Sequence, residues 1–204
     1  MTIALIIEGE TEKVFLSVLR DFLRRHLAGR MPNINPLRYD GRIPTGEKLK
    51  RKVATLLDGS NAADYVIALT DVYTGSQPPD FHDAVDAKAK MRLWVGKEPR
   101  FHPHVAQHDF EAWLLPYWPT IQRLAGHNQQ MPPGNPEMVN HTNPPAHRIK
   151  DIFERGQCKR SYVKPRDALR ILKDNDLAVA INRCAELKAF VNTIISLSGG
   201  EELP

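Results

Sequence analysis

The chain has 204 residues, of which 42% are hydrophobic and 25% are charged, and its formal net charge is +4. These values are ordinary for a soluble globular protein with one sizeable core, and no apolar stretch approaches the roughly 20 residues of a membrane span. The mild basicity is compatible with a nucleic-acid partner, although many proteins without such a partner are equally basic.

The first part of the chain alternates between predicted strands and helices. Residues 3–7 form a continuous, mostly β-branched aliphatic run, which is typical of a central parallel strand covered on both faces. Apolar residues at helical spacing then predict a helix over residues 11–27. A second strand over residues 33–39 and an amphipathic helix over residues 47–57 follow.

The same alternation continues through the middle of the chain. We predict a buried strand over residues 65–69, a helix over residues 83–95 and a strand over residues 101–106. Pro103 interrupts the last strand and marks it as a candidate edge strand. This order predicts an α/β fold, with a mainly parallel, Rossmann-like sheet of about four strands flanked by helices.

The composition changes in the second half of the chain. Residues 110–124 form an apolar, aromatic stretch that predicts a helix, kinked or broken by Pro116 and Pro119. Three more helices are predicted, over residues 146–154, 165–173 and 177–195. We therefore divide the chain into an α/β domain (residues 1–126), a Pro- and Asn-rich loop (127–146) and a helical extension packed on the same domain (147–204).

The cysteines and the first residues indicate a compartment. Cys158 and Cys184 are far apart and lack CxxC spacing, which argues against a disulfide scaffold or a zinc ribbon and favours a reducing cytoplasm. The apolar run before Glu8 is short and has neither a basic start nor a small-residue cleavage site, so we expect no signal peptide.

Acidic residues follow three of the predicted strands, at the point where each strand ends. Glu8 follows the first strand, Asp71 follows "YVIAL", and the segment "QHDFEAW" brings His108, Asp109 and Glu111 after the fourth strand. Ligands of open α/β sheets bind at the carboxyl ends of the strands. Crowded carboxylates raise one another's pKa unless a cation neutralises them, and hard oxygen ligands suit Mg²⁺ or Mn²⁺.

Each of these acids also has a structural explanation. Glu10 and Glu12 lie in the first turn of a predicted helix, where the helix dipole stabilises acidic side chains, and Asp71 could cap a turn. Glu8 is harder to explain in this way, because it ends a buried strand and precedes Gly9, which lets the backbone turn sharply. The segment matches neither GxGxxG nor GxxxxGK[ST], so we exclude a nucleotide phosphate loop.

The histidines suggest two further sites. His102 and His104 lie on the same face of a strand and could bind Zn²⁺, but Pro103 disturbs that strand and no cysteine is near. His108 is the better candidate, because beside the acids it could orient a carboxylate or transfer a proton. A buried structural histidine is the alternative.

One basic segment is a candidate for phosphate contact. "CKRSYVKPRDAL" contains Lys159, Arg160, Lys164 and Arg166 in a loop that leads to a predicted helix, and it includes an aromatic residue. Lys164 is the preferred residue, because it stands just before the helix N-terminus. The aromatic residues of 110–124 could stack on bases, but at helical spacing such residues are more often core.

Three segments carry a resemblance to a known family. "IIEGETEKVFL" looks like the first motif of Toprim domains, a strand that ends in Glu-Gly before a helix opened by Thr-Glu. "ALTDVY" resembles the second Toprim strand, which normally ends in Asp-x-Asp. "HDFEAWL" is similar to a segment of the Toprim-like domain-of-unknown-function family 4276, which is related to the overcoming-lysogenization-defect (OLD) nucleases. The resemblance covers residues 2–118, and the later helices are similar in outline.

This resemblance implies a Toprim-like, divalent-metal-dependent nuclease or other phosphodiester-processing enzyme that acts on DNA or RNA, in phage defence or DNA repair. Glu8 would match the Toprim acid, which is a general acid/base or a metal ligand, and Asp71 would match the first Asp of the pair. Tyr73 stands where the second Asp is expected. The alternative is therefore a non-catalytic module that binds metal or nucleic acid and works through a partner protein.

The candidate roles can be stated by residue. The predicted catalytic residues are Glu8, Asp71, His108 and Glu111. The predicted ligands of Mg²⁺ or Mn²⁺ are Glu8, Asp71, Glu12 and Glu111, and Glu12, Asp109 or Glu111 would have to replace the missing Asp. The predicted nucleic-acid contacts are Lys159, Arg160, Lys164 and Arg166.

Overall fold

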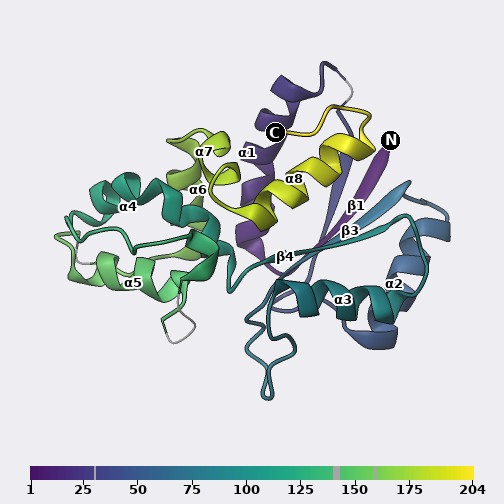
Figure 1. Ribbon diagram of the computed structural model, residues 1–204, viewed down its shortest axis with the longest axis horizontal. Coiled ribbons are helices and arrows are strands. Elements are labelled where there is room, and N and C mark those ends of the chain that lie inside the picture. Colours follow the sequence, from purple (N-terminus) through teal and green to yellow (C-terminus); the bar gives the residue numbers. More distant parts are fainter. Residues whose placement is uncertain (30, 140–142, 159) are drawn as a thin grey trace.

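The aliphatic runs of the sequence form a four-stranded sheet in a computed structural model, which describes residues 1–29, 31–139, 143–158 and 160–204 (Figure 1). The strands are β1 (Thr2–Ile7), β2 (Asn33–Arg38), β3 (Tyr65–Asp71) and β4 (Phe101–Ala106). Their order in the sheet is β2-β1-β3-β4, and each neighbouring pair is parallel. The predicted fold class is confirmed, and β4 is an edge strand as its proline indicated.

Helices cover both faces of this sheet. The connecting helices are α1 (Glu10–His26), α2 (Gly46–Asp58) and α3 (Ala84–Val95). Ile3, Leu5 and Ile7 of β1 pack in a core with α1, whereas Ala4 and Ile6 pack in a second core with α2 and α3. Successive strand residues point to opposite faces, so an uninterrupted apolar run is what a strand buried on both sides requires.

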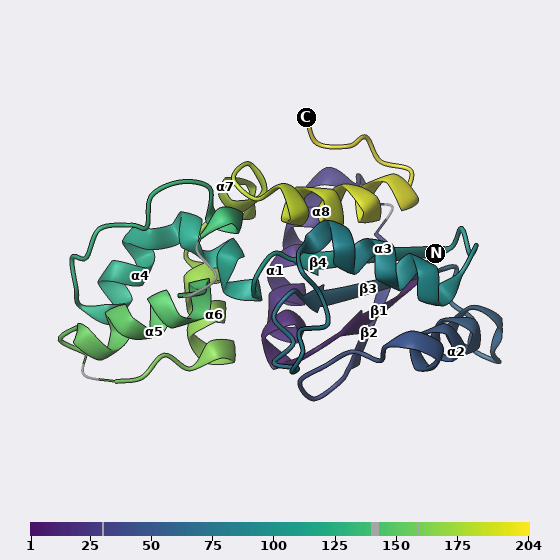
Figure 2. The same cartoon turned by 60° about the horizontal axis from the view of Figure 1, so that its bottom comes forward.

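After β4 the chain forms further helices, most of which lie at the end of the sheet where the strands finish, whereas the last one lies along the sheet against β4 (Figure 2). They are the 3₁₀ helix η1 (Phe110–Tyr117), α4 (Trp118–Ala125), the 3₁₀ helix η2 (Pro136–Met138), α5 (Pro145–Arg155), α6 (Lys164–Lys173), α7 (Leu177–Ile181) and α8 (Ala185–Leu197). The predicted aromatic helix is broken at Trp118, as its prolines indicated. In the described part of the chain, no helix is long and apolar enough to cross a membrane.

The predicted single helix over residues 177–195 is wrong, because the structure has two helices, α7 and α8, in its place. The physical reason is a distant partner. The carboxylate of Glu137 accepts hydrogen bonds from the backbone N–H of Glu186 at 3.1 Å, at the start of α8. A buried carboxylate that satisfies exposed N–H groups favours a new helix start at this point.

The aromatic side chains of residues 110–124 are core, which confirms the preferred interpretation. Trp113 and Trp118 are buried, and their indole N–H groups donate to Glu137 Oε1 at 3.1 Å and to the carbonyl of Gln129 at 2.7 Å. Apolar residues of the C-terminal helices share one core with α1 and the sheet. The division of the chain at residues 126 and 147 stays a prediction.

Candidate functional site

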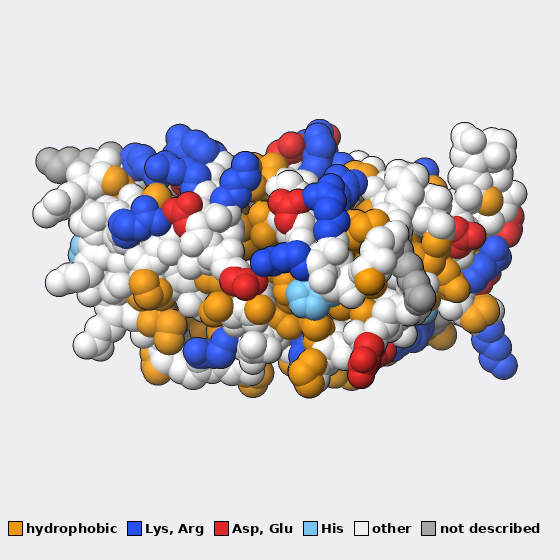
Figure 3. Space-filling view, turned by 90° about the horizontal axis from the view of Figure 1, so that it is seen from above, with side chains coloured by type: hydrophobic (Ala, Val, Ile, Leu, Met, Phe, Trp, Pro, Cys, Tyr) orange, Lys and Arg blue, Asp and Glu red, His pale blue; other side chains and the backbone are white. Residues whose placement is uncertain are grey.

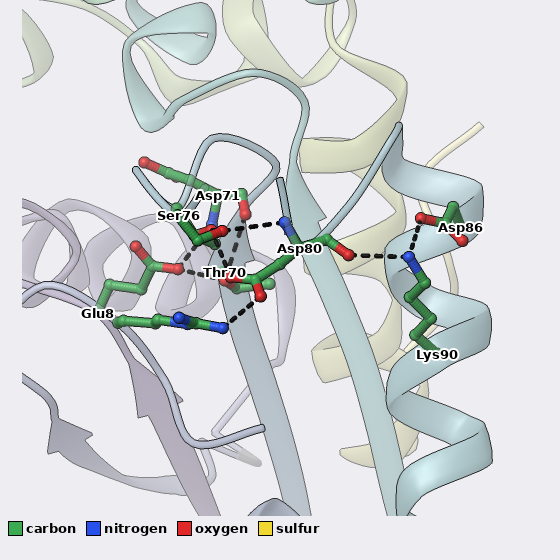
Figure 4. Close-up of polar contacts among 9 residues, drawn as sticks. Glu8, Thr70, Asp71, Ser76, Asp80, Asp86 and Lys90 are labelled. Atoms are coloured by element: carbon green, nitrogen blue, oxygen red, sulfur yellow. Dashed lines mark hydrogen bonds and ion pairs between the residues drawn. The ribbon is translucent and has the colours of Figure 1, made fainter. Parts of the chain in front are cut away.

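Glu8 lies at the carboxyl end of β1, between β2 and β3 in the sheet. It is 7% exposed, and its Oε1 accepts hydrogen bonds from the hydroxyl of Thr70 and from the backbone N–H of Asp71 at 3.1 Å (Figure 4). Both donors belong to the end of β3, so the parallel pairing of β1 and β3 fixes the carboxylate of Glu8.

The residues after Glu8 begin α1. The chain bends at Glu8 and Gly9 as expected, but Gly9 has φ −146°, which is extended backbone that any residue adopts, so the bend does not depend on glycine. The N–H of Gly9 donates to Glu12 Oε2 at 3.0 Å, which is the half of a capping box that the acidic residue supplies. One oxygen of Glu12, a predicted metal ligand, therefore stabilises the start of the helix.

Asp109 and Glu111 lie where β4 passes into η1. Glu111 has no exposed surface, and its two oxygens accept from the Tyr162 hydroxyl at 3.3 Å and from Lys164 Nζ at 3.1 Å. Asp109 is 6% exposed, and its Oδ2 accepts from the backbone N–H of Ala146 at 3.2 Å. Its other oxygen, Oδ1, is buried and has no hydrogen-bond donor among the described residues.

Five acidic side chains at this edge of the sheet act on one another electrostatically. We call them the acidic cluster, which consists of Glu8, Glu12, Asp71, Asp109 and Glu111. Burial raises the pKa of Glu8 to about 7, and the charge of Glu12 adds to this effect. Burial and the charge of Glu111 raise the pKa of Asp109 to about 7. The pKa of Asp71 is raised well above its ordinary value, by burial and then by the charges of the other four.

Lys164 partly neutralises the acidic cluster. Its charge lowers the pKa values of Glu8, Glu12 and Asp109. Burial alone would lower the pKa of Lys164, but the carboxylates, with Glu111 first, outweigh burial and raise it. Lys164 is the first residue of α6, so the helical extension supplies a cation to acids that the sheet and η1 position.

The other predicted basic residues do not join Lys164. Lys159 lies outside the described residues. Arg160 and Arg166 instead contact the carboxylate of Asp167, at 2.7 Å and 3.1 Å, and the guanidinium of Arg160 lies 4.8 Å from the ring of Phe153. Lys164 thus contacts the buried carboxylate of Glu111, whereas Arg160 and Arg166 contact that of Asp167. The sequence did not reveal these contacts.

The surface charges do not form one basic patch on the face drawn in Figure 3, where Lys and Arg side chains are spread out and acidic side chains lie between them. A net charge of +4 is therefore not concentrated on that face. Recognition of a polyanion there would depend on a few positioned side chains rather than on a broad field.

His108 and Tyr73 face each other beside the acidic cluster. Their rings lie 5.6 Å apart, and the backbone N–H of Tyr73 donates to the carbonyl of His108 at 2.9 Å. Burial lowers the pKa of His108, and a hydrogen bond to the backbone of Glu137 opposes that shift. The ring of His108 is thus turned to Glu137 and Tyr73, and its role in proton transfer stays a prediction.

The chemistry of the acidic cluster suits a divalent cation, although its described side chains do not form a complete set of metal ligands. Its ligands are hard oxygens, burial and then mutual repulsion raise their pKa values, and Asp109 Oδ1 is a buried acceptor with no donor in the described part of the chain. Within the described ranges, no group of three or more His, Cys, Asp and Glu side chains is arranged to hold a metal ion. The zinc site that we considered at His102 and His104 is therefore not found among the described residues.

Two residues of the site were missed by sequence reasoning. Thr70 donates to Glu8, and its signal was a polar residue inside the apolar run "YVIALTD". Tyr162 donates to Glu111 from 51 residues away in the sequence, and no local pattern indicates that contact.

Comparison with known proteins gives a family and a fold. The family model described as "Domain of unknown function (DUF4276)" matches residues 7–195. The structure is similar to the C-terminal region of the Burkholderia pseudomallei OLD protein, with 14% identity, a TM-score of 0.54, and coverage of 97% of this chain and 98% of that chain. This likeness extends over the sheet and the helical extension.

A second solved structure, the C-terminal region of the Xanthomonas campestris pv. campestris OLD protein, is 12% identical, with a TM-score of 0.49 and coverage of 97% of this chain and 96% of that chain. No curated protein matches the chain.

Proposed function

The chain belongs to the DUF4276 family, and we propose that it is a divalent-metal-dependent nuclease, or another enzyme that processes nucleic-acid phosphodiesters. One observation carries the proposal. Carboxylates with raised pKa values gather at the carboxyl edge of a parallel sheet, and one buried oxygen, Asp109 Oδ1, has no hydrogen-bond donor among the described residues. Such perturbed groups at the ligand-binding edge of a sheet are typical of functional sites.

Each part of the acidic cluster has a role in this proposal. Glu8, Asp71, Asp109 and Glu111 would hold Mg²⁺ or Mn²⁺, together with the second oxygen of Glu12. The ion would supply a Lewis acid for the phosphate and lower the pKa of a water molecule. Thr70 keeps the carboxylate of Glu8 in place, and Glu8 or His108 would transfer the proton.

Lys164 supplies the positive charge that a phosphodiester needs at this site. Its ammonium group lies 3.1 Å from Glu111 Oε2, and its side chain is half-exposed, so we propose that a substrate phosphate approaches Lys164 from solvent. A cation at the developing negative charge stabilises the transition state of phosphoryl transfer. By its resemblance to OLD-related nucleases, we propose that the protein acts in phage defence or DNA repair.

The experiment is cleavage of labelled DNA and RNA with Mg²⁺ or Mn²⁺. We expect Glu8→Gln to lower the cleavage rate by about 100-fold or more, because a general acid/base contributes about 10²–10⁴-fold. The matched control is Glu10→Gln, two residues away, because Glu10 is exposed and pairs with Lys13 and Arg38. Equal cleavage by wild type and Glu8→Gln would show that another site or a contaminant cuts the substrate.

A second function, a non-catalytic module that binds metal or nucleic acid, is favoured by different observations. Tyr73 replaces the second Asp of the Toprim pair, and the described acids do not close around a metal position. This function predicts that wild type binds nucleic acid without cutting it. It also predicts that Tyr73→Asp, which restores the pair, gains metal-dependent cleavage.

A further inference from the structure

An ion pair connects the two segments that flank the strand of Glu8. Arg42 follows β2, Asp80 lies in the loop that follows β3, and Arg42 Nη2 donates to Asp80 Oδ1. Because β2 and β3 are the two neighbours of β1, this pair bridges the carboxyl end of β1, where Glu8 begins the acidic cluster.

The segment that carries Arg42 is attached to Glu8 through the backbone. The N–H of Tyr39 donates to the carbonyl of Ile7 at 2.9 Å, and the N–H of Gly41 donates to the carbonyl of Glu8 at 3.2 Å. Gly41 has φ +98°, a conformation that favours glycine, and it changes the chain direction directly before Arg42. Arg42 is therefore held beside the site by the same strand end that positions Glu8.

Asp80 is fixed by the loop around it (Figure 4). Its Oδ2 accepts from the Thr74 hydroxyl at 2.5 Å, its N–H donates to Ser76 Oγ at 3.0 Å, and its carbonyl accepts from Lys90 Nζ at 2.8 Å. The side chain of Asp80 is 17% exposed, whereas that of Arg42 is 42% exposed. Asp80 is thus held in place by several hydrogen bonds, and it orients the more accessible guanidinium of Arg42.

A guanidinium held in this way can still bind an anion. Arg42 has five N–H donors in a planar fork, and Asp80 is its hydrogen-bond partner among the described residues. A fork that is already oriented loses less side-chain entropy when it binds a phosphate. The acidic cluster itself repels phosphates, so a nucleic-acid strand that reaches Glu8 needs cations at its border.

We propose that Arg42 binds a backbone phosphate of the nucleic-acid strand next to the acidic cluster, with Asp80 as the residue that positions it. This inference rests on the proposed function and specifies how the substrate is held. Lys164 contacts Glu111 on the β4 side of the site, and Arg42 lies on the β2 side. The strand would therefore cross the carboxyl edge of the sheet between two cations that come from opposite ends of the sheet.

The test measures binding of labelled single-stranded and duplex oligonucleotides by fluorescence anisotropy in EDTA, over a series of salt concentrations. For Arg42→Gln we expect about a 5- to 10-fold loss of affinity at low salt, and a salt slope reduced by about one, as for the loss of one phosphate contact. Arg51→Gln, at an exposed arginine of α2, is the matched control and should bind like wild type.

The positioning role of Asp80 is tested without a change of charge. Thr74→Val removes the hydroxyl that holds Asp80, so we expect about a two- to threefold loss of affinity with an unchanged salt slope, because Arg42 keeps its charge. Thermal melts of each variant check that the fold is retained.

The outcomes separate the inference from the proposed function. If wild type cleaves nucleic acid but Arg42→Gln binds with wild-type affinity and slope, the role of Arg42 is overturned and the nuclease proposal stands. If Arg42→Gln loses affinity while wild type cleaves nothing with Mg²⁺ or Mn²⁺, the contact is supported and the nuclease is contradicted. If wild type binds no oligonucleotide, the contact is overturned, and the cleavage assay alone decides on the nuclease.

Discussion

The carboxylate of Asp167 and the carboxylates of the acidic cluster have pKa values that are shifted in opposite directions. Asp167 has no exposed surface and contacts Arg160 and Arg166. Burial alone would raise the pKa of Asp167, but these hydrogen bonds outweigh it and lower the pKa to about 2. In the acidic cluster, burial and like charges raise the pKa values of Glu8 and Asp109 to about 7.

The difference lies in the number of neighbouring cations. Arg170 is a third arginine beside Asp167, at 3.9 Å, whereas the five carboxylates of the acidic cluster share Lys164. A buried acid with enough cations stabilises the fold, and a group of acids with too few is electrostatically incomplete. We infer that Asp167 is structural, and that the acidic cluster has kept an unfavourable arrangement because a bound cation completes it.

We expect the largest change in stability when the carboxylate of Asp167, which its arginines neutralise, is removed. Asp167→Asn removes the negative charge between Arg160 and Arg166, and we expect a loss of about 2 kcal/mol in the free energy of unfolding, as for hydrogen bonds to a charged group whose partners are partly exposed. Glu8→Gln should be neutral or stabilising when no metal is present, because it removes a repelled charge. Urea unfolding in EDTA measures both. Equal destabilisation by Asp167→Asn and Glu8→Gln would show that Asp167 and the acidic cluster contribute to stability in the same way.

The pH dependence of stability should have opposite signs for the two groups. In the folded chain Glu8 and Asp109 keep protons up to about pH 7, whereas unfolding restores their ordinary, lower pKa values. Without metal, stability should therefore fall as the pH rises from about 4 to about 7. The contribution of Asp167 is present above its ordinary pKa and is lost as the pH falls toward 2.

Chemical unfolding at a series of pH values checks these signs. Glu8→Gln should flatten the decline between pH 4 and 7 and leave the acid limb unchanged. A decline of the same slope in Glu8→Gln would assign the effect to other groups.

The sequence revealed the acids better than their partners. Glu8, Asp71 and Asp109 could be placed together because parallel strands of apolar residues end at one edge: Glu8 follows β1, Asp71 ends β3, and Asp109 comes shortly after β4. The cations could not be placed in this way. Lys164 reaches Glu111 across 53 residues, and its side chain enters the site because α6 packs on η1.

The same limit explains what the sequence did not reveal elsewhere. No local pattern indicates that Arg160 and Arg166 contact the buried carboxylate of Asp167, and their contact with nucleic acid stays a prediction. The helix predicted over residues 177–195 is split because Glu137, far away in the sequence, caps the start of α8. Periodicity reports on the local chain, and it contains no information about buried carboxylates from another segment.

The smallest effect is the response to metal, and it tests the comparison most directly. A divalent cation that binds the folded chain stabilises it by about 1.4 kcal/mol at ten times its dissociation constant. For a domain of this size that corresponds to a rise in melting temperature of about 3–5 °C. We expect this rise with Mg²⁺ or Mn²⁺ but not with NaCl of equal ionic strength, because monovalent screening cannot bridge carboxylates.

Three variants locate the binding site. Glu8→Gln and Asp109→Asn should lose the rise, because they remove oxygens from the acidic cluster, and the exposed Glu10→Gln should keep it. A rise that persists in Glu8→Gln and Asp109→Asn would place the ion elsewhere. No rise in wild type would contradict the proposed metal site.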